Sequence, residues 1–204
     1  MSFRKIKAFS SKELALIALF SSLWITSQIY LGPLIGRLTG EHGVIQRFLG
    51  WLLMLLIARL TGKFGRVTLM AAVASLATRI IRPGAIYSLF VGLGYALGGL
   101  TFDLLYFLPS KAIQTRKTSL LLISLVSSMI AGIPYMLYRL AFLSLYGFLM
   151  WLPFYIPDLI RSVLLSVTGT LTGLFIAPKI ETRIPIALEA LKREIREKLL
   201  KDGG

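Results

Sequence analysis

The chain consists of long apolar stretches separated by short segments that are rich in glycine, proline, arginine and lysine. Several of these stretches are about 20 residues long and nearly free of charge, which is the length that a helix needs to cross about 30 Å of hydrocarbon. Glycine and proline stand at the joints, where they commonly end helices. The pattern therefore predicts an all-α, polytopic membrane protein.

Six membrane-spanning helices are expected, with approximate bounds 13–31, 44–60, 67–81, 85–108, 118 to 135–139, and 157–177. The first should end in the turn GPLIGRLTGEHG, and the last should end ahead of Pro178. Residues 140–156, LAFLSLYGFLMWLPFYI, form either a seventh span or an interfacial belt or lid. The second interpretation is favoured because the segment is short, contains Gly147 and Pro153, and is rich in aromatic residues.

The distribution of charge supports six spans and suggests an orientation. Basic residues gather on the cytoplasmic side of membrane proteins. With the N-terminus inside, every lysine falls on that side, and the outer bases are all arginines: Arg37, Arg47, Arg79, Arg82, Arg139 and Arg161. A seventh span would place the basic tail outside. We therefore predict a six-helix transmembrane bundle in the plasma membrane, with the N- and C-termini cytoplasmic.

The chain divides into two parts on this interpretation. Residues 1–180 form the six-helix transmembrane bundle, and residues 181–204 form a basic cytoplasmic tail. The tail places apolar residues on one stripe and acidic and basic residues at i,i+4 spacing, which is typical of an amphipathic helix. Such a helix lies on the inner membrane surface or against a partner. The alternative is a frayed tail without a role.

Composition excludes several classes of protein. Hydrophobic residues make up 56% of the chain and charged residues 16%, whereas a soluble domain usually carries about 25% charged residues. The net charge of +14 is explained by basic loops beside the spans, so no nucleic-acid partner is inferred. Cysteine is absent and His42 is the only histidine, so we expect no disulfide and no metal site.

Motifs for catalysis are also missing from the sequence. There is no G-x-x-x-x-G-K-[ST], no H-E-x-x-H, no G-x-S-x-G and no pair of carboxylates at metal-binding spacing. The chain therefore cannot hold ATP in a P-loop, and we expect neither an enzyme nor a bound cofactor.

The outer arginines are the main candidates for function. Four helices deliver Arg47, Arg79, Arg82, Arg139 and Arg161 to one membrane level, where only Glu41 and Asp158 are available to neutralise them. Guanidinium groups bind carboxylate or phosphate in a bidentate manner. The cluster predicts an outward-facing pocket for an anionic or strongly hydrogen-bonding small molecule. The alternative is that each arginine reaches lipid headgroups.

Aromatic and amide side chains near the same level complete the predicted pocket. They are Trp24, Tyr30, Trp51, Tyr87, Tyr135 and Trp151, with Gln28 and Gln46. The aromatic rings would stack on a planar ligand and the amides would orient it. Anchoring at the membrane interface is the common alternative for tryptophan and tyrosine.

Small residues form stripes that allow helices to approach closely. The first helix carries Ser11, Ala15, Ala18 and Ser22 on one face, which suits another subunit or internal packing. Gly94-x-x-x-Gly98 and Gly169-x-x-x-Gly173 have the same character and favour packing within the bundle. Asp103, in the inner half of its span, is expected to pair with a base such as Arg59 or to cap neighbouring backbone rather than to carry function.

The region LTGKFGRVTLMAAVASLATRIIRPGAIYSLFVGLGYALGGLTFDLLYFL resembles the substrate-binding S components of energy-coupling factor (ECF) ABC transporters. The similar elements are T-G-K-F-G, R-P-G-A and F-D-L-L, and the opening ELALIALFSSLW with LGPLIGRL also looks like their first helix and turn. The branch it is most similar to is the hydroxymethylpyrimidine- and thiamine-related one. The resemblance covers roughly residues 13–108, and the remainder is similar only in helix count and length.

The resemblance implies a six-helix bundle that binds a vitamin or its precursor near the outer face. It also implies a complex with a transmembrane coupling component and two ATPase subunits, in which the small-residue face of the first helix meets the coupling component. The sequence thus predicts the substrate-capture subunit of a vitamin or micronutrient importer. Two alternatives remain open: a stand-alone facilitator or channel, and a structural subunit whose arginines bind lipid.

Overall fold

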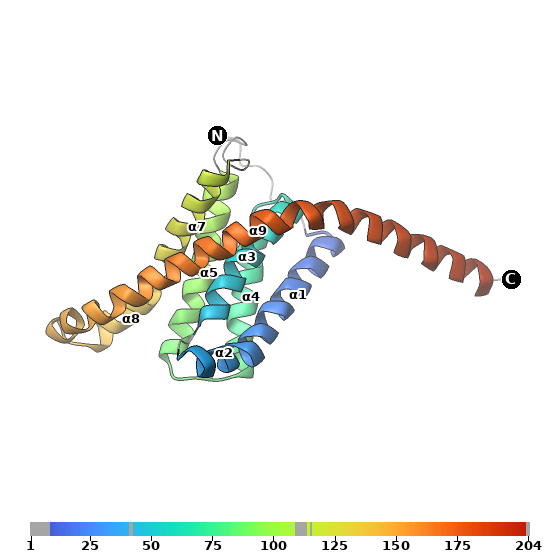
Figure 1. Ribbon diagram of the computed structural model, residues 1–204. Coiled ribbons are helices and arrows are strands. Elements are labelled where there is room, and N and C mark those ends of the chain that lie inside the picture. The colour runs from blue at the N-terminus through green and yellow to red at the C-terminus, as the bar shows by residue number, and fades with distance from the viewer. Residues whose placement is uncertain (1–8, 41–42, 109–113, 115, 203–204) are drawn as a thin grey trace.

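The computed structural model describes residues 9–40, 43–108, 114 and 116–202, and for residues 183–202 it describes only the backbone. The described residues form helices joined by short connections, without a strand among them (Figure 1). The prediction of an all-α protein is therefore confirmed. Five helical stretches within these ranges are long and apolar enough to cross a membrane: Ser11–Thr39, Val44–Thr61, Tyr87–Phe107, Lys117–Phe142 and Leu145–Thr182.

The surface of the described bundle is also compatible with a membrane environment. Large apolar side chains stand on it with much of their area uncovered, among them Leu38, Ile80, Phe154 and Phe175. Extensive exposure of large apolar side chains is unusual for a soluble monomer. Lipid would cover these side chains without the free-energy cost that water imposes.

The first helical stretch is longer than predicted. It consists of α1 (Ser11–Thr26), a π-helical turn η1 (Ser27–Leu31) and α2 (Gly32–Thr39). The expected turn at GPLIGRLTGEHG is therefore wrong over most of its length, and the helix ends at Gly40, whose φ is 72°. Pro33 lies just after the π turn η1, and a proline or a π turn is a common place for a helix to bend.

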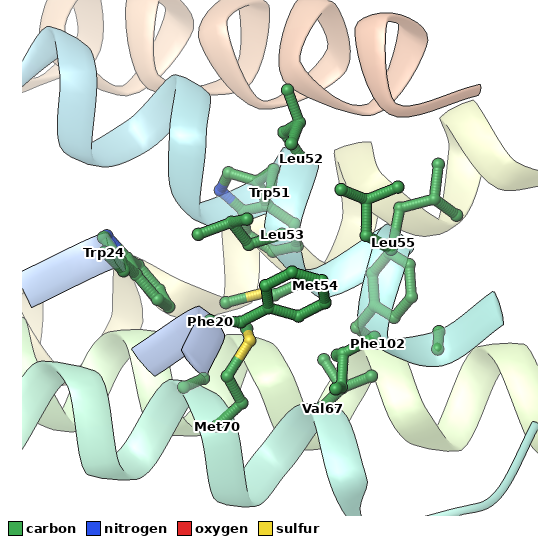
Figure 2. Close-up of a cluster of buried hydrophobic side chains, with 14 of the residues drawn as sticks. Phe20, Trp24, Trp51, Leu52, Leu53, Met54, Leu55, Val67, Met70 and Phe102 are labelled. Carbon is green, nitrogen blue, oxygen red and sulfur yellow. The ribbon is translucent and has the colours of Figure 1, made fainter. Parts of the chain in front are cut away.

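Helix α3 (Val44–Thr61) lies at the centre of the bundle. Residues 51–58 are all buried, so this helix is covered on every side. Figure 2 shows how neighbouring helices reach it: Phe20 and Trp24 come from α1, and Phe102 comes from α5 (Tyr87–Phe107). Val67 and Met70 come from α4 (Arg66–Ile81). This core holds the helices that carry the candidate site.

The number of spans remains a prediction. Helix α4 has 16 residues, which is fewer than the roughly 20 that a perpendicular crossing needs. It corresponds to the short third span expected from the sequence, and it packs on α3 and α5 inside the bundle. Length alone therefore supports five spans among the described residues, and six if α4 is counted.

The second half of the chain differs from the predicted boundaries. Helices α7 (Lys117–Ala131) and α8 (Ile133–Phe142) follow each other with a change of direction at Gly132, and α9 (Leu145–Asp202) is one helix of 58 residues. The predicted start at residue 157 and end at residue 177 are therefore wrong as helix boundaries. Pro153, Pro157 and Pro178 lie inside α9 and are exposed. Proline is tolerated within membrane helices when neighbouring groups satisfy the freed carbonyls.

Residues 145–156 are the first turns of α9 and do not form a separate seventh span. Figure 1 shows α9 leaving the hairpin with α8, crossing the bundle over α3 and extending well past it toward the C-terminus. The helix continues through residue 180 without a break. The amphipathic character predicted for the tail concerns side chains that lie outside the described ones.

Two pairs of glycines bring helix backbones together, as the spacing predicted. A Cβ atom added at Gly169 would lie 2.2 Å from the main-chain oxygen of Phe48 in α3. One added at Gly94 would lie 2.2 Å from the main-chain oxygen of Ala131 in α7. Both glycine motifs are thus confirmed as internal packing. The stripe of Ser11, Ala15, Ala18 and Ser22 is exposed on α1, and its use as a partner surface stays a prediction.

A buried ion-pair network closes the end of the bundle where α1 begins. The carboxylate of Glu13 accepts hydrogen bonds from Lys63 and from Nε and Nη2 of Arg66, the latter at 3.1 and 2.8 Å. Glu13 and Arg66 are only 6% and 2% exposed. Arg66 also donates to the main-chain oxygen of Phe64 at 2.9 Å. The T-G-K-F-G segment is therefore tied to the first turn of α1, which sequence reasoning did not find.

Asp103 has the capping role that the sequence favoured. Its Oδ2 atom accepts from the N–H and the hydroxyl of Thr68, at 2.8 and 2.6 Å, in the first turn of α4. Arg59 does not pair with it, because Arg59 bonds Glu181 on α9 at 2.8 Å. Asp103 thus satisfies an N–H group that the start of α4 leaves unpaired.

Candidate functional site

Helix α2, the start of α3 and the start of α5 lie at one end of the bundle (Figure 1). Residues at this end line two cavities. The larger, which we call the aromatic cavity, has a volume of about 240 Å³. It is enclosed by α3, α5, α7, α8 and α9. Its lining residues are Arg47, Trp51, Tyr87, Val91, Tyr95, Ser128, Ala131, Gly132, Tyr135, Asp158, Leu159 and Ser162.

A bidentate ion pair forms one wall of the aromatic cavity. Arg47, in the first turn of α3, donates from Nη1 and Nη2 to the two carboxylate oxygens of Asp158 on α9, at 2.8 and 2.7 Å. The Arg47 side chain is 17% exposed and that of Asp158 is 44% exposed. Paired N–H···O bonds of this kind fix the relative orientation of both groups. Because Asp158 neutralises Arg47, this wall presents a donor and an acceptor side by side and no net charge.

Tyr87 and Tyr135 contribute aromatic rings to the lining of the same cavity. Tyr135 of α8 lies 6.2 Å from Tyr87, 5.7 Å from Trp151 and 6.0 Å from Tyr155, measured between ring centroids. Trp151 and Tyr155 stack on each other at 4.8 Å. The absence of a side chain at Gly132 admits Tyr155, whose hydroxyl would lie 2.5 Å from a Cβ atom there. Tyr135 therefore lines the cavity itself, and Trp151 and Tyr155 of α9 pack against it.

Arg139 contacts the rings of Tyr135 and Trp151. Its Nε and Nη2 atoms donate to the Tyr135 hydroxyl at 3.0 and 2.8 Å. Its guanidinium carbon lies 5.3 Å from the centre of the Tyr135 ring and 5.4 Å from that of Trp151. These distances allow cation–π attraction. Arg139 and Trp151 therefore hold Tyr135 in place but do not line the cavity themselves.

The smaller hollow, which we call the polar cavity, has a volume of about 190 Å³. It lies between η1, α3, α4 and α5. All of its lining residues are polar: Gln28, Gln46, Thr78, Arg79, Arg82 and Ser88. Arg79 donates from Nε to the main-chain oxygen of Ser88 at 3.1 Å and from Nη1 to the side-chain oxygen of Gln28 at 3.4 Å.

Tyr95 of α5 lines the aromatic cavity. Its ring packs edge-on against Trp24 at 5.4 Å, and the residue is 8% exposed. Its hydroxyl lies near Gln46, which lines the polar cavity, and near Arg47, which lines the aromatic cavity. Sequence reasoning did not select Tyr95. The feature of the sequence that could have identified it is the polar hydroxyl group of a tyrosine inside the apolar run SLFVGLGYALGGL.

The structure separates the predicted site residues into distinct groups. Arg47, Trp51, Tyr87 and Tyr135 line the aromatic cavity, and Gln28, Gln46, Arg79 and Arg82 line the polar cavity. The expected single pocket is therefore two hollows in the described structure. Asp158 was considered only as a counter-charge, whereas Ser128 and Ser162 were not considered.

Other predicted residues lie away from both hollows. Trp24 is fully buried in the core, where its ring fills the space beside Gly50. It is therefore a packing residue, and no described cavity exposes it to a ligand. Tyr30 is 72% exposed on η1, and Arg161 is exposed on α9; neither lines a cavity. Glu41 and His42 lie outside the described residues.

Among the described residues, no group of three or more His, Cys, Asp or Glu side chains is arranged to hold a metal ion. The chemistry that the two cavities offer is hydrogen bonding, ion pairing and ring stacking. Comparison with known proteins found no protein-family model, no curated protein and no solved structure that matches this chain.

Proposed function

We propose that this protein is the substrate-capture subunit of a membrane importer, and that the aromatic cavity binds a small, planar, polar solute. The observation that carries the proposal is the pairing of flat aromatic walls with the Arg47–Asp158 ion pair in one cavity of about 240 Å³. Ligand sites typically combine an apolar lining with a few well-placed polar groups.

The dimensions and charge of the cavity narrow the class of solute. Its volume lies just below the roughly 300–1,000 Å³ of drug-sized pockets, which favours a single substituted ring over a nucleotide or a lipid. Tyr135 and Tyr87 offer ring faces, and the ion pair offers a donor and an acceptor. A heteroaromatic ring with amino or carbonyl substituents would match these groups better than a simple anion, because the charge of Arg47 is already balanced.

The energy for import would come from other subunits. The chain lacks a P-loop, so ATP hydrolysis would need partner ATPases, as the resemblance to ECF S components implies. In this proposal the protein lies in the plasma membrane with both termini in the cytoplasm. The exposed small residues of α1 then meet a transmembrane coupling component, and the cavity end faces outward.

The proposal is tested by identifying what the purified protein retains. The full chain is purified in mild detergent and analysed by native mass spectrometry, followed by extraction of small molecules. We expect a heteroaromatic compound bound to the wild type and lost in Tyr135→Leu. Tyr146→Leu is the matched control, since Tyr146 is 73% exposed and lies on the first turn of α9. Retention of phospholipid alone by the wild type would contradict the proposal.

A second measurement separates an importer subunit from a stand-alone facilitator. The tagged chain is isolated from its native membranes, and the co-purifying proteins are identified. We expect a coupling component and ATPase subunits in defined ratio. Passive, ATP-independent uptake of the retained compound into liposomes that contain this chain alone would instead identify a facilitator.

A further inference from the structure

The polar cavity carries positive charge that no acidic side chain of its described lining neutralises. Arg79 and Arg82 contribute guanidinium groups, and the other described lining residues are neutral. The aromatic cavity differs in this respect, because the charge of Arg47 there is balanced by Asp158. A partly buried cation without a counter-ion is costly next to lipid, so an anionic ligand would stabilise the described arrangement.

The guanidinium group of Arg79 is held in a fixed orientation. Main-chain oxygens of Ser88 and Ser75 accept from its Nε and Nη1 atoms, at 3.1 and 3.2 Å. Helix α5 passes close behind it, since a Cβ atom at Gly92 would lie 3.3 Å from Nε. These contacts occupy one edge of the planar group. Among the described residues the Nη2 atom takes part in no hydrogen bond, so its donors remain available.

Gln28 is a second donor without a partner. The residue is only 8% exposed, and its side-chain oxygen already faces Arg79. Its Nε2 atom is buried and has no hydrogen-bond partner in the described structure. An unpaired buried N–H group is unfavourable and rare in folded proteins. Gln28 therefore indicates that an acceptor belongs in the polar cavity.

We propose that the polar cavity is a binding site for an oxyanion, a carboxylate or phosphate group, held by Arg79 and Arg82 with the amide of Gln28. Several N–H donors and two positive charges converge there, and delocalised oxyanions are the groups that guanidinium forks bind best. A volume of about 190 Å³ accommodates such a group with a short substituent. The inference goes beyond the proposed function, because it concerns a different cavity and stands even if the aromatic cavity binds nothing.

The anion has two sources with the same chemistry, a soluble solute and the phosphate of a lipid headgroup. Two arms of one experiment distinguish them. In the first arm the full chain is placed in phosphatidylcholine nanodiscs, and binding of radiolabelled inorganic phosphate is measured by equilibrium dialysis at constant ionic strength. In the second arm nanodiscs of mixed phosphatidylcholine and phosphatidylglycerol are used, and native mass spectrometry counts the anionic lipids that stay on the released protein.

Three variants make the test specific. Arg79→Gln removes the guanidinium group that is held in a fixed orientation. Arg82→Gln removes the second positive charge, and because Arg82 is exposed, this substitution leaves the packing of the bundle unaffected. Each should weaken phosphate binding, or retention of one anionic lipid, by at least about tenfold, as expected for loss of a charge-assisted pair. Arg161→Gln is the matched control on α9, outside both cavities, and should change binding by less than about twofold.

Each outcome decides the proposal. Saturable phosphate binding that Arg82→Gln weakens supports a site for a soluble anion. Retention of one phosphatidylglycerol that Arg82→Gln abolishes supports the same site with lipid as its source. Binding in neither arm, or equal loss in Arg82→Gln and Arg161→Gln, overturns the proposal, and the Arg82 variant remains informative even if Arg79→Gln does not fold.

Discussion

The buried network around Glu13 leads to a prediction about stability that can be worked from the structure. The substitution Glu13→Gln removes one negative charge and keeps the shape of the side chain. The remaining amide oxygen can still accept from the N–H of Ser10, which completes the capping box at the start of α1. The change therefore isolates the ion pairs of Glu13 with Lys63 and Arg66.

The expected cost follows from how deeply each partner is buried. The Arg66 side chain is 3% exposed, so the substitution removes a carboxylate partner from a guanidinium group in a place that water does not reach. Breaking a buried pair in this way costs about 3–5 kcal/mol. The Lys63 side chain is 38% exposed and can turn to solvent. Arg66 keeps its bond to Phe64 and its position 4.1 Å from the Phe9 ring, so we expect about 3 kcal/mol, at the lower end.

The matched control is another ion pair between helices. Glu181 bonds Arg59 at 2.8 Å, with side chains that are 35% and 29% exposed. Because both groups keep contact with solvent, Glu181→Gln should lower the free energy of unfolding by less than about 1 kcal/mol. The two substitutions make the same chemical change, but Glu13 is buried and pairs with two bases, whereas Glu181 is half-exposed and pairs with Arg59.

The assay is unfolding of the purified chain in mixed micelles as the fraction of sodium dodecyl sulfate is raised. Tryptophan fluorescence is a suitable signal, since Trp24 and Trp51 are buried in the core. The double variant Glu13→Leu/Arg66→Met should recover much of the lost stability, because apolar groups of similar size often replace a buried pair at little cost. The reasoning is refuted if Glu13→Gln costs no more than Glu181→Gln.

Two further predictions concern the packing of the bundle. Gly169→Ala should lower the free energy of unfolding by about 2 kcal/mol or more through overpacking, because the new methyl group would lie 2.2 Å from a main-chain oxygen of α3. The control is Gly147→Ala, whose Cβ atom would meet nothing nearer than 3.4 Å, and it should change the free energy of unfolding by less than about 0.5 kcal/mol. Equal effects of the two substitutions would contradict the close approach of α9 to α3. Asp103→Leu should cost about 1–3 kcal/mol, because two donors of α4 lose their acceptor; an unchanged unfolding midpoint in the same assay would show that Asp103 does not cap α4.

The residue pattern was sufficient to predict the class of fold. Long apolar stretches can satisfy their backbone groups in lipid only as helices or closed barrels, and their length and composition favoured helices. Glycines four residues apart predicted close helix contacts, which Gly94 and Gly169 make. The possibility that Asp103 pairs with a base or caps neighbouring backbone favoured a structural role for it. These inferences succeed because they depend on local spacing and on the cost of exposing polar groups.

Helix boundaries depended on the fold. Proline at residues 157 and 178 reads as a terminator in isolation, yet α9 runs through both. A helix can continue through a proline when groups from neighbouring segments satisfy the carbonyl that has lost its hydrogen-bond donor. The local sequence does not show whether such groups are present. The same reason explains why Gly32 and Pro33 begin α2 instead of closing a turn.

The division of the candidate site was also decided by tertiary structure. The sequence predicted that Arg47, Arg79 and Arg82 lie at one membrane level as a single group. The position of a residue in its helix indicates its depth in the membrane, but not which residues of other helices it faces. Only the packing of α9 onto α3 brings Asp158 to Arg47 across 111 positions of sequence separation, and only the packing of α5 brings Tyr95 into the lining of the aromatic cavity. The charge balance of a cavity depends on which side chains meet across helices. Only the tertiary structure therefore distinguishes the aromatic cavity, where Asp158 balances Arg47, from the polar cavity, whose described lining holds two arginines and no acidic residue.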